Sequence, residues 1–239
     1  MPKFFTGKDC ISNDNIIIKG EDVSHISRVL RMSVGDEITV CDGCGTDYEA
    51  EITSIGKSAV EAKIISRSIC EAEPKVKVTL FQALPKQGKM EYIIQKNTEL
   101  GVFKIVPVYT KRCVAKPSDK TERWNKIALE AAKQCGRGII PVVQDTIGFD
   151  EALKLMSNFH HKIMLYESEK NTTLRSVISG AEIDEIAVLV GPEGGFDEQE
   201  VQKAADLGII TVTLGRRILR TETAGAAVVP IIMYEQGDI

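Results

Sequence analysis

The pattern of apolar and polar positions changes character near residue 74. Before it, four short runs alternate or are continuously apolar in the way of β-strands, at residues 15–18, 37–40, 48–55 and 59–65. Turn residues separate these runs, and one helical pattern covers about residues 22–31. Short strands interrupted by one helix are typical of a small β-barrel or sandwich.

After a polar stretch at residues 71–74 that ends in proline, strand-like and helical patterns alternate. The strand patterns cover residues 76–83, 104–109, 161–167, 186–190 and 209–214, and the helical patterns cover 86–100, 121–134, 149–156 and 223–234. Strands that alternate with helices predict an α/β fold with a mostly parallel sheet covered on both faces. We therefore expect two domains, residues 1–72 and 73–239.

Two glycine-containing loops follow strands in the second of these regions. Gly191–Gly195 ends the apolar run at 186–190, and Asp197 with Glu200 then has the spacing of a helix capping box. Gly215 opens a second loop after residues 209–214. Glycines let main-chain groups approach a ligand, and ligands of open parallel sheets lie beyond the carboxyl ends of the strands. Neither loop matches a dinucleotide or Walker A motif, so ordinary strand-to-helix turns are an equal alternative.

Composition narrows the class of protein. Apolar residues make up 43% of the chain and charged residues 27%, as in globular proteins. No signal peptide and no apolar run of membrane-spanning length is evident, so we expect a cytoplasmic protein without membrane contact, in which the six cysteines are reduced. Cys41 and Cys44 lack the further ligands of a zinc site, and their surroundings predict a hairpin turn; no metal site is expected.

The charge is distributed unevenly along the chain. Residues 1–74 hold 8 Lys and Arg against 13 Asp and Glu, a net charge of −5, whereas residues 75–239 hold 22 against 21, a net charge of +1. The acidic first part weakens non-specific attraction to phosphates. A nucleic-acid partner would therefore have to be recognised by a local basic patch and by shape, which favours a structured RNA.

Two long motifs together resemble a known family. L-V-G-P-E-G-G-F at residues 189–196 and L-G-R-R-I-L-R-T-E-T-A at 214–224 are similar to the signature of the RsmE family, and the similarity extends to residues 25–31, 89–101, 112–113 and 131–137. Members of that family are bacterial methyltransferases of the SPOUT superfamily that act on N3 of a uridine in 16S ribosomal RNA. The resemblance implies a PUA-like β-barrel RNA-binding domain followed by a SPOUT domain with a deep C-terminal trefoil knot.

The resemblance also implies a cofactor and partners. The cofactor would be S-adenosyl-L-methionine, the macromolecular partner 16S ribosomal RNA or the small ribosomal subunit, and the assembly a homodimer formed through the apolar last helix. No metal is needed. The residues implied to surround the cofactor are Leu165, Tyr166, Glu167, Val190, Gly191, Pro192, Glu193, Gly194, Gly195, Leu214, Gly215, Ile218, Leu219, Thr223 and Ala224.

Methylation of N3 requires the loss of a proton and the stabilisation of charge on O2 and O4 of the uracil. A carboxylate base and an arginine donor suit these roles. Glu222 and Arg220 directly follow the second glycine loop and are the candidate catalytic pair. A structural Arg–Glu salt bridge that fixes the last helix is an equal alternative.

Basic side chains supply the candidate RNA-binding surface. Arg28 and Arg31 are three residues apart in a predicted helix and would share one of its faces. The full set comprises His25, Arg28, Arg31, Lys86, Lys89, Lys96, Arg112, Lys133 and Arg137. Scattered solubility charges are the alternative for these side chains. Two other functions remain open for the whole chain, a SPOUT ribose 2′-O-methyltransferase and a non-catalytic RNA-binding assembly factor.

Overall fold

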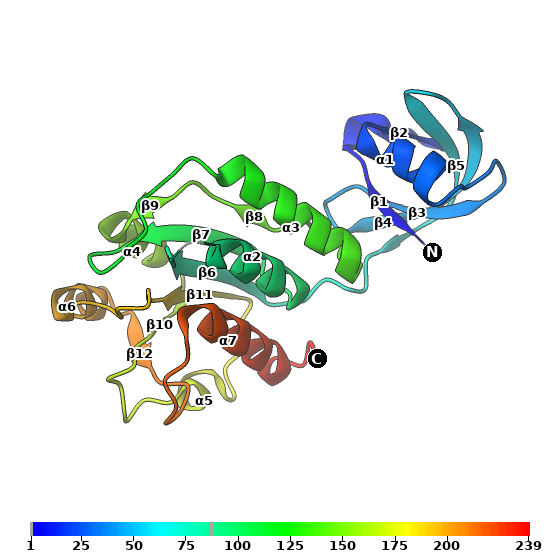
Figure 1. The fold of residues 1–239 in the computed structure, drawn as a ribbon. Helices are drawn as coiled ribbons and strands as arrows, with labels where there is room; N and C mark the ends of the chain where they lie inside the picture. Colours follow the sequence, from blue (N-terminus) through cyan, green and yellow to red (C-terminus); the bar gives the residue numbers. More distant parts are fainter. Residues whose placement is uncertain (1, 87) are drawn as a thin grey trace. The chain divides into compact units, whose positions relative to one another are not determined.

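The computed structural model describes residues 2–86 and 88–239, and it divides the chain into two compact units (Figure 1). The smaller unit comprises Met1–Glu73 with Ala132–Ile140, and the larger comprises Pro74–Ala131 with Pro141–Ile239. The chain first crosses from the smaller to the larger unit between Glu73 and Pro74, one residue after the predicted boundary between residues 72 and 73. The sequence did not predict that Ala132–Ile140 belongs to the smaller unit, because this depends on contacts with residues far away in the sequence.

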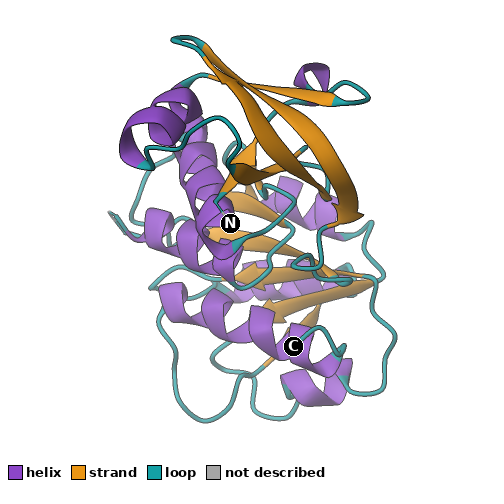
Figure 2. Cartoon of the chain, turned by 90° about the vertical axis from the view of Figure 1, so that its right-hand side faces the viewer, coloured by secondary structure: helices purple, strands orange, loops and turns teal. Residues whose placement is uncertain are grey.

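The smaller unit is built on a five-stranded sheet of order β1-β3-β4-β5-β2. All neighbours are antiparallel except β1 and β3, and Figure 2 shows the strong curvature of the long strands. In β2 the inward positions Ile16 and Ile18 are fully buried while their neighbours are exposed, as an alternating strand requires. The strands are β1 (Lys3–Phe5), β2 (Asn15–Lys19), β3 (Glu37–Cys41), β4 (Thr46–Ile55) and β5 (Ala59–Ile69).

The helix predicted at residues 22–31 is shorter and less regular than expected. It consists of α1 (Glu21–Ser24) and a π-helical turn, η2 (His25–Val29), while a 3-10 turn, η1 (Lys8–Cys10), lies earlier. Arg31 lies beyond the helix with a left-handed backbone angle φ of 53°. The prediction that Arg28 and Arg31 share a helix face is therefore wrong.

The hairpin predicted around Cys41 and Cys44 is confirmed. Strands β3 and β4 pair antiparallel on either side of it, and Asp42 Oδ1 accepts hydrogen bonds from the backbone N–H groups of Cys44 and Thr46. All six cysteines are free thiols.

The larger unit contains the predicted parallel sheet. Its order is β12-β10-β11-β6-β7-β8, with β9 also paired to β7, and every neighbouring pair is parallel. The strands are β6 (Lys77–Ala83), β7 (Lys104–Tyr109), β8 (Val142–Val143), β9 (Ile147–Gly148), β10 (His161–Leu165), β11 (Glu185–Val190) and β12 (Ile210–Val212). The predicted α/β fold class is thus confirmed.

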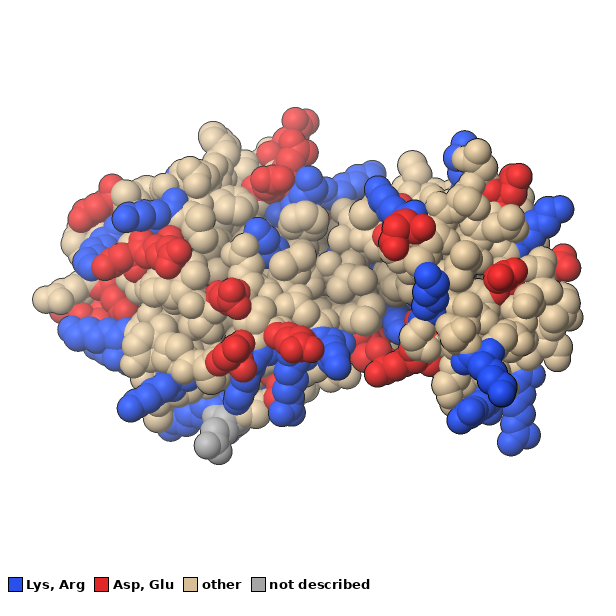
Figure 3. Space-filling view, turned by 90° about the horizontal axis from the view of Figure 1, so that it is seen from above, with Lys and Arg blue, Asp and Glu red and all other residues tan. Residues whose placement is uncertain are grey.

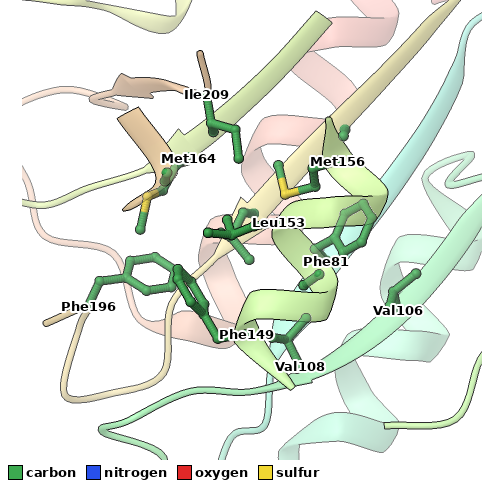
Figure 4. Close-up of a cluster of buried hydrophobic side chains, with 13 residues drawn as sticks. Phe81, Val106, Val108, Phe149, Leu153, Met156, Met164, Phe196 and Ile209 are labelled. Atoms are coloured by element: carbon green, nitrogen blue, oxygen red, sulfur yellow. The ribbon is translucent and has the colours of Figure 1, made fainter. Parts of the chain in front are cut away.

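Helices cover both faces of this sheet. Phe149, Leu153 and Met156 of α4 pack against Phe81 and other strand residues in one core cluster, to which α6 contributes Ala204 (Figure 4). On the opposite face α7 packs against α2, and a Cβ on Gly225 would lie 3.3 Å from Leu80. The helices are α2 (Lys89–Glu99), α3 (Thr121–Cys135), α4 (Phe149–Met156), α5 (Leu174–Ile178), α6 (Glu198–Asp206) and α7 (Thr221–Glu235).

The last helix is apolar almost throughout, which favours burial on all sides, against a partner subunit as well as against the sheet. Within the single chain Ile231 and Tyr234 are 44% and 70% exposed. The predicted helix at 86–100 begins at Lys89 in the structure, and Gln87 lies outside the described residues. No helix within residues 2–86 and 88–239 combines the length and the apolar character that crossing a membrane requires.

Candidate active site

Three neighbouring strands of the larger unit end at one cavity. β10 lies between β12 and β11 in the sheet, so their carboxyl ends are adjacent. The loop Gly191–Gly195 follows β11, the segment Thr213–Arg220 follows β12, and Tyr166 and Glu167 follow β10. Together with the start of α7 they enclose a cavity of about 550 Å³. This is the position at which open parallel sheets bind ligands.

Most of the predicted cofactor residues line this cavity. They are Leu165, Tyr166, Glu167, Val190, Gly191, Pro192, Glu193, Gly194, Gly195, Leu214, Gly215, Ile218, Leu219 and Ala224. Thr223 does not line it, because it lies on the exposed side of α7. The structure adds lining residues that were not predicted for the cavity, namely Lys89, Val212, Thr213, Arg216, Arg217 and Thr221.

Two glycines in the cavity wall have backbone angles that other residues rarely adopt. Gly195 has φ +66°, and a Cβ placed on it would collide with the carboxylate of Glu167. Gly215 has φ +111° and open space around the position of a Cβ. At Gly195 the constraint is both steric and conformational, whereas at Gly215 it is conformational alone. At these two positions the loops therefore present main chain rather than a side chain.

Lys89 and Glu193 line the cavity, whereas the predicted catalytic residue Glu222 is not among its lining residues and is joined to it through Lys89. Its Nζ lies 3.1 Å from Glu222 Oε2 and 3.3 Å from Glu193 Oε1. These contacts raise the pKa of Lys89, chiefly through the hydrogen bond to Glu222 against the opposing effect of desolvation, so the ammonium stays charged at neutral pH. The interpretation of Glu222 as the salt-bridge partner of Arg220 is not supported by these contacts, because the carboxylate is bound by Lys89.

Glu193 is fixed as an anion in the first glycine loop. It accepts hydrogen bonds from the backbone N–H of Lys86 at 3.0 Å and from Lys89. Burial acts to raise the pKa of Glu193, but its own backbone N–H, that of Lys86 and the Lys89 ammonium outweigh it and hold the pKa below its usual value. Lys89 thus stands between two carboxylates, Glu193 in the cavity lining and Glu222 beside it.

A buried hydroxyl fixes the first glycine loop to the last helix. Thr221 Oγ1 donates to the carbonyl oxygen of Gly191 at 2.6 Å and accepts from Gln82 Nε2 at 2.9 Å. Gln82 has no exposed surface and Thr221 only 5%. One side chain therefore connects the end of β6, the loop after β11 and the start of α7. Thr221 shares its helix face with the buried Ala224, Gly225 and Val228, and that 3–4 spacing is the sequence signal that would have identified it.

The helix that follows the first loop begins as predicted. Asp197 caps α6 and forms a complete capping box with Glu200. Arg112 donates to the carbonyl oxygen of Gly194 at 3.2 Å and lies 3.7 Å from Asp197. A hydrogen bond from Lys111 is the main cause of the lowered pKa of Asp197. Arg112 therefore braces the glycine loop from outside the cavity.

The other predicted RNA-binding residues lie in different environments. In the smaller unit His25, Arg28 and Arg31 are exposed, whereas Lys133 is paired with Asp22 at 2.9 Å. Arg137 is only 3% exposed and binds Glu73 through two nitrogens, at 3.2 and 2.8 Å. In the larger unit Lys86 is exposed and Lys96 pairs with Glu99. These residues do not form one continuous group, and no group of three or more His, Cys, Asp or Glu in the described part of the chain is placed to hold a metal ion.

Comparison with known proteins identifies the family. Residues 72–233 match the family model of an RNA methyltransferase domain, and residues 18–65 match that of an RNA methyltransferase PUA domain. The chain is 36% identical over 228 residues to the ribosomal RNA small subunit methyltransferase E of Bacillus subtilis, which covers 91% of this chain and 89% of that protein. The enzyme of the same name from Buchnera aphidicola is 28% identical over 243 residues, with coverage of 100% and 95%.

Solved structures agree with this assignment. The crystal structure of a ribosomal RNA small subunit methyltransferase E from Neisseria gonorrhoeae, bound to S-adenosyl methionine, is 34% identical, with a TM-score of 0.88 and coverage of 98% of this chain and 97% of that one. A methyltransferase of Legionella pneumophila in complex with the same cofactor is 29% identical, with a TM-score of 0.85 and coverage of 98% and 97%. The chain belongs to the RNA methyltransferase family whose members include the ribosomal RNA small subunit methyltransferases E.

Proposed function

We propose that this protein transfers a methyl group from S-adenosylmethionine to N3 of a uridine in the 16S RNA of the small ribosomal subunit. The observation that carries this proposal is the cavity at three adjacent strand ends, which has a wall of glycine loops and is lined by Glu193 and by Lys89, whose ammonium binds Glu222. The family's RNA methyltransferase and PUA domains give the class of substrate. The named relatives act on small-subunit ribosomal RNA.

The cavity suits S-adenosylmethionine in size and in chemistry. Its volume of about 550 Å³ lies in the range of sites that enclose small cofactors. Leu165, Val190, Leu214 and Leu219 provide apolar surface for the adenine ring, and the main chain of Gly191–Gly195 and Gly215 provides donors and acceptors for polar groups. When bound, the cofactor supplies the methyl group; the protein supplies orientation and electrostatics.

Charged residues in and beside the cavity supply the proton acceptor and the positive charge that methylation of uridine N3 requires. Uridine N3 carries a proton at neutral pH, and Glu222 is the carboxylate placed to accept it. Lys89 holds Glu222 by a 3.1 Å hydrogen bond and provides positive charge where the uracil oxygens become negative. Arg220 lines the cavity with an exposed side chain and is the second donor. The sequence predicts Lys89 on the RNA-binding surface. We infer instead that Lys89 acts on the uracil base that is methylated.

The RNA-binding surface is proposed to consist of exposed basic residues in each unit. His25, Arg28 and Arg31 serve in the smaller unit, and Lys86 and Arg112 in the larger one. Basic and acidic side chains are interspersed on the face drawn in Figure 3, so recognition relies on local contacts and RNA shape rather than on a broad basic field. The ion pairs of Lys133 and Arg137 give these two residues a structural role in the smaller unit.

Assembly and threading belong to the same proposal. We infer a cytoplasmic homodimer that pairs through α7, because Ile231 and Tyr234 leave apolar surface exposed on that helix.

We also infer that the segment after β12 is threaded as a trefoil knot. Two features support it: α7 returns from the edge strand β12 to the central strands β6 and β11, and the two glycine loops meet at one cavity.

The test is methylation of small subunits that lack the modification. Purified protein, S-adenosylmethionine and small ribosomal subunits from a bacterium without such an enzyme are incubated, and the nucleosides of the RNA are analysed by mass spectrometry. N3-methyluridine is the expected product. A ribose-methylated nucleoside would instead indicate 2′-O-methylation, and no product would indicate a binding protein.

A variant of Glu222 tests the chemistry. Glu222→Gln nearly keeps the shape and removes the base, so single-turnover methylation at neutral pH is expected to fall about 10²- to 10⁴-fold while the cofactor still binds. Activity of the variant should recover at high pH, where N3 loses its proton unaided. Glu235→Gln, a matched change at the other end of α7, should be neutral. A Glu222→Gln enzyme with the wild-type rate would exclude Glu222 as the base.

A further inference from the structure

The larger unit contains a second cavity that the methyl-transfer chemistry does not use. It measures about 590 Å³ and lies between the segment after β6, the start of α2, the loop after β7 and the first turn of α3. The residues that line it are Leu84, Pro85, Lys86, Gly88, Met90, Glu91, Val114, Ala115, Lys116, Ser118, Lys120 and Trp124.

This cavity is a close neighbour of the candidate active site. Lys86 lines the second cavity and donates its backbone N–H to Glu193, which lines the first. Lys89, three residues later, lines the first cavity and binds the same carboxylate. Lys86 from the second cavity and Lys89 from the first thus bind one carboxylate, that of Glu193. A flexible polymer with one unit in the active site has its adjoining units within reach of the second cavity.

The lining combines an apolar interior with a basic rim. Trp124, 3% exposed, and Met90, 6% exposed, supply buried apolar surface, and Val114 is 69% exposed. Lys86, Lys116 and Lys120 are exposed lysines. The acidic lining residue, Glu91, is paired with Arg123 at 2.8 Å, so its charge is compensated. Apolar surface with an aromatic ring and surrounding ammonium groups is the chemistry that binds a base together with its phosphates.

We propose that this cavity holds an unstacked nucleobase of the RNA substrate, next to the nucleotide that is methylated, with the adjoining phosphates on Lys116 and Lys120. The proposal rests on the proposed function for the identity of the substrate. The volume is sufficient for a nucleotide. Three lysines favour a polyanion as the occupant over another protein surface. Binding two neighbouring nucleotides in two cavities would hold the target base out of its stack.

The protein contains an intrinsic fluorescent probe for binding in this cavity. Trp124 is the single tryptophan of the protein and lines this cavity, so a base that enters should change its fluorescence emission. Protein is titrated with a short single-stranded oligoribonucleotide containing uridine, and binding is measured in parallel by the anisotropy of a labelled copy. An oligonucleotide of equal charge with abasic positions is the ligand control. Saturating RNA is expected to change the emission, and the abasic ligand to change it much less.

Two variants separate the interior of the cavity from its rim. Ser118→Phe fills the cavity from an exposed position and should weaken RNA binding about 5- to 150-fold, the loss typical of one stacked base. Lys116→Ala with Lys120→Ala should lower the salt slope of binding by about 1.4, the value for two phosphate contacts to a single strand. Lys126→Ala with Lys154→Ala removes the same charge from exposed positions outside the cavity and should leave the slope unchanged. Cofactor affinity, measured by calorimetry, should be the same in all variants.

The outcomes distinguish this proposal from the proposed function. Unchanged Trp124 emission at saturating RNA, or wild-type RNA affinity of Ser118→Phe, overturns the base-binding cavity even when the enzyme makes N3-methyluridine. A change of mass in light scattering caused by Ser118→Phe would assign the cavity to contact between copies and equally overturn it. Conversely, quenching and weakened binding in a protein that methylates no ribosomal RNA would support the cavity and refute the proposed reaction.

Discussion

Replacing Thr221 by valine is expected to loosen the first glycine loop without changing the shape of the side chain. The hydroxyl donates to the Gly191 carbonyl and accepts from Gln82. Valine preserves the volume but removes both hydrogen bonds. Because Gly191 forms part of the cavity wall, the substitution should reduce both the stability of the larger unit and its affinity for S-adenosylmethionine.

The expected loss of stability follows from the hydrogen bonds that Gln82 and Gly191 lose. Gln82 Nε2 keeps one hydrogen bond, to the Ala83 carbonyl at 3.0 Å, but its second N–H becomes a buried donor without a partner, at a cost of about 1 to 3 kcal/mol. Gly191 is half-buried, so water can reach its carbonyl and the loss there is about 0.5 to 1.5 kcal/mol. The free energy of unfolding should therefore fall by about 1.5 to 4.5 kcal/mol.

Urea unfolding followed by Trp124 emission measures this change, because the single tryptophan lies in the larger unit. The midpoint should shift while the slope stays constant. Thr221→Ser keeps the hydroxyl and should lose about 1 kcal/mol or less, and Thr223→Val, at an exposed position of the same helix, should change stability by about 0.5 kcal/mol or less. A Thr221→Val protein as stable as Thr223→Val would refute the bracing role.

Three further predictions concern other parts of the molecule. Gly215→Val forces a β-branched residue to φ +111° and should weaken cofactor binding by about 1 to 3 kcal/mol in calorimetry; unchanged affinity would contradict this role. The N–H groups of Thr172 and Asn171, then the Thr211 hydroxyl, lower the pKa of Glu169 from 4.5 to about 2, so its contribution to stability is present above pH 4.5 and lost as the pH falls towards 2. An NMR titration should show this value, and a higher one in Thr211→Val. Ile231→Asp should convert the proposed dimer to a monomer in light scattering, and a monomeric wild type would exclude pairing through α7.

Local signals in the sequence predicted most of the elements and the loops that line the cavity. The capping box of Asp197 and Glu200 depends on residues three positions apart, and the structure contains it as predicted. The apolar run before Gly191 is long enough to identify a buried strand, and sheet order then brings the two glycine loops together. By contrast, β8 and β9 have two residues each, which is too few to produce a recognisable pattern.

Ion pairs between residues far apart in the sequence could not be predicted from such local signals. Lys89 is 104 residues from Glu193 and 133 from Glu222, so no local spacing distinguishes it from an ordinary surface lysine. Arg137 has a side chain suited to RNA contact, but its partner Glu73 is 64 residues away, in the polar stretch at residues 71–74. The prediction that Arg31 shares a helix face with Arg28 was wrong for a different reason, because the π-helical turn ends the helix before Arg31. Side-chain chemistry was predictable, whereas the choice of partner depended on the fold.

The return of Ala132–Ile140 to the smaller unit has a consequence during synthesis. The carbonyl of Gly138 accepts from Cys41 Sγ and from the backbone N–H of Gly45, and Glu73 accepts from the N–H groups of Gly138 and Ile139. An emerging chain cannot complete this unit when residue 73 leaves the ribosome. It must wait for residue 140, about 3 to 13 s later at ordinary elongation rates. The first unit to be translated is therefore not finished first, and part of the second must be made before the first can close.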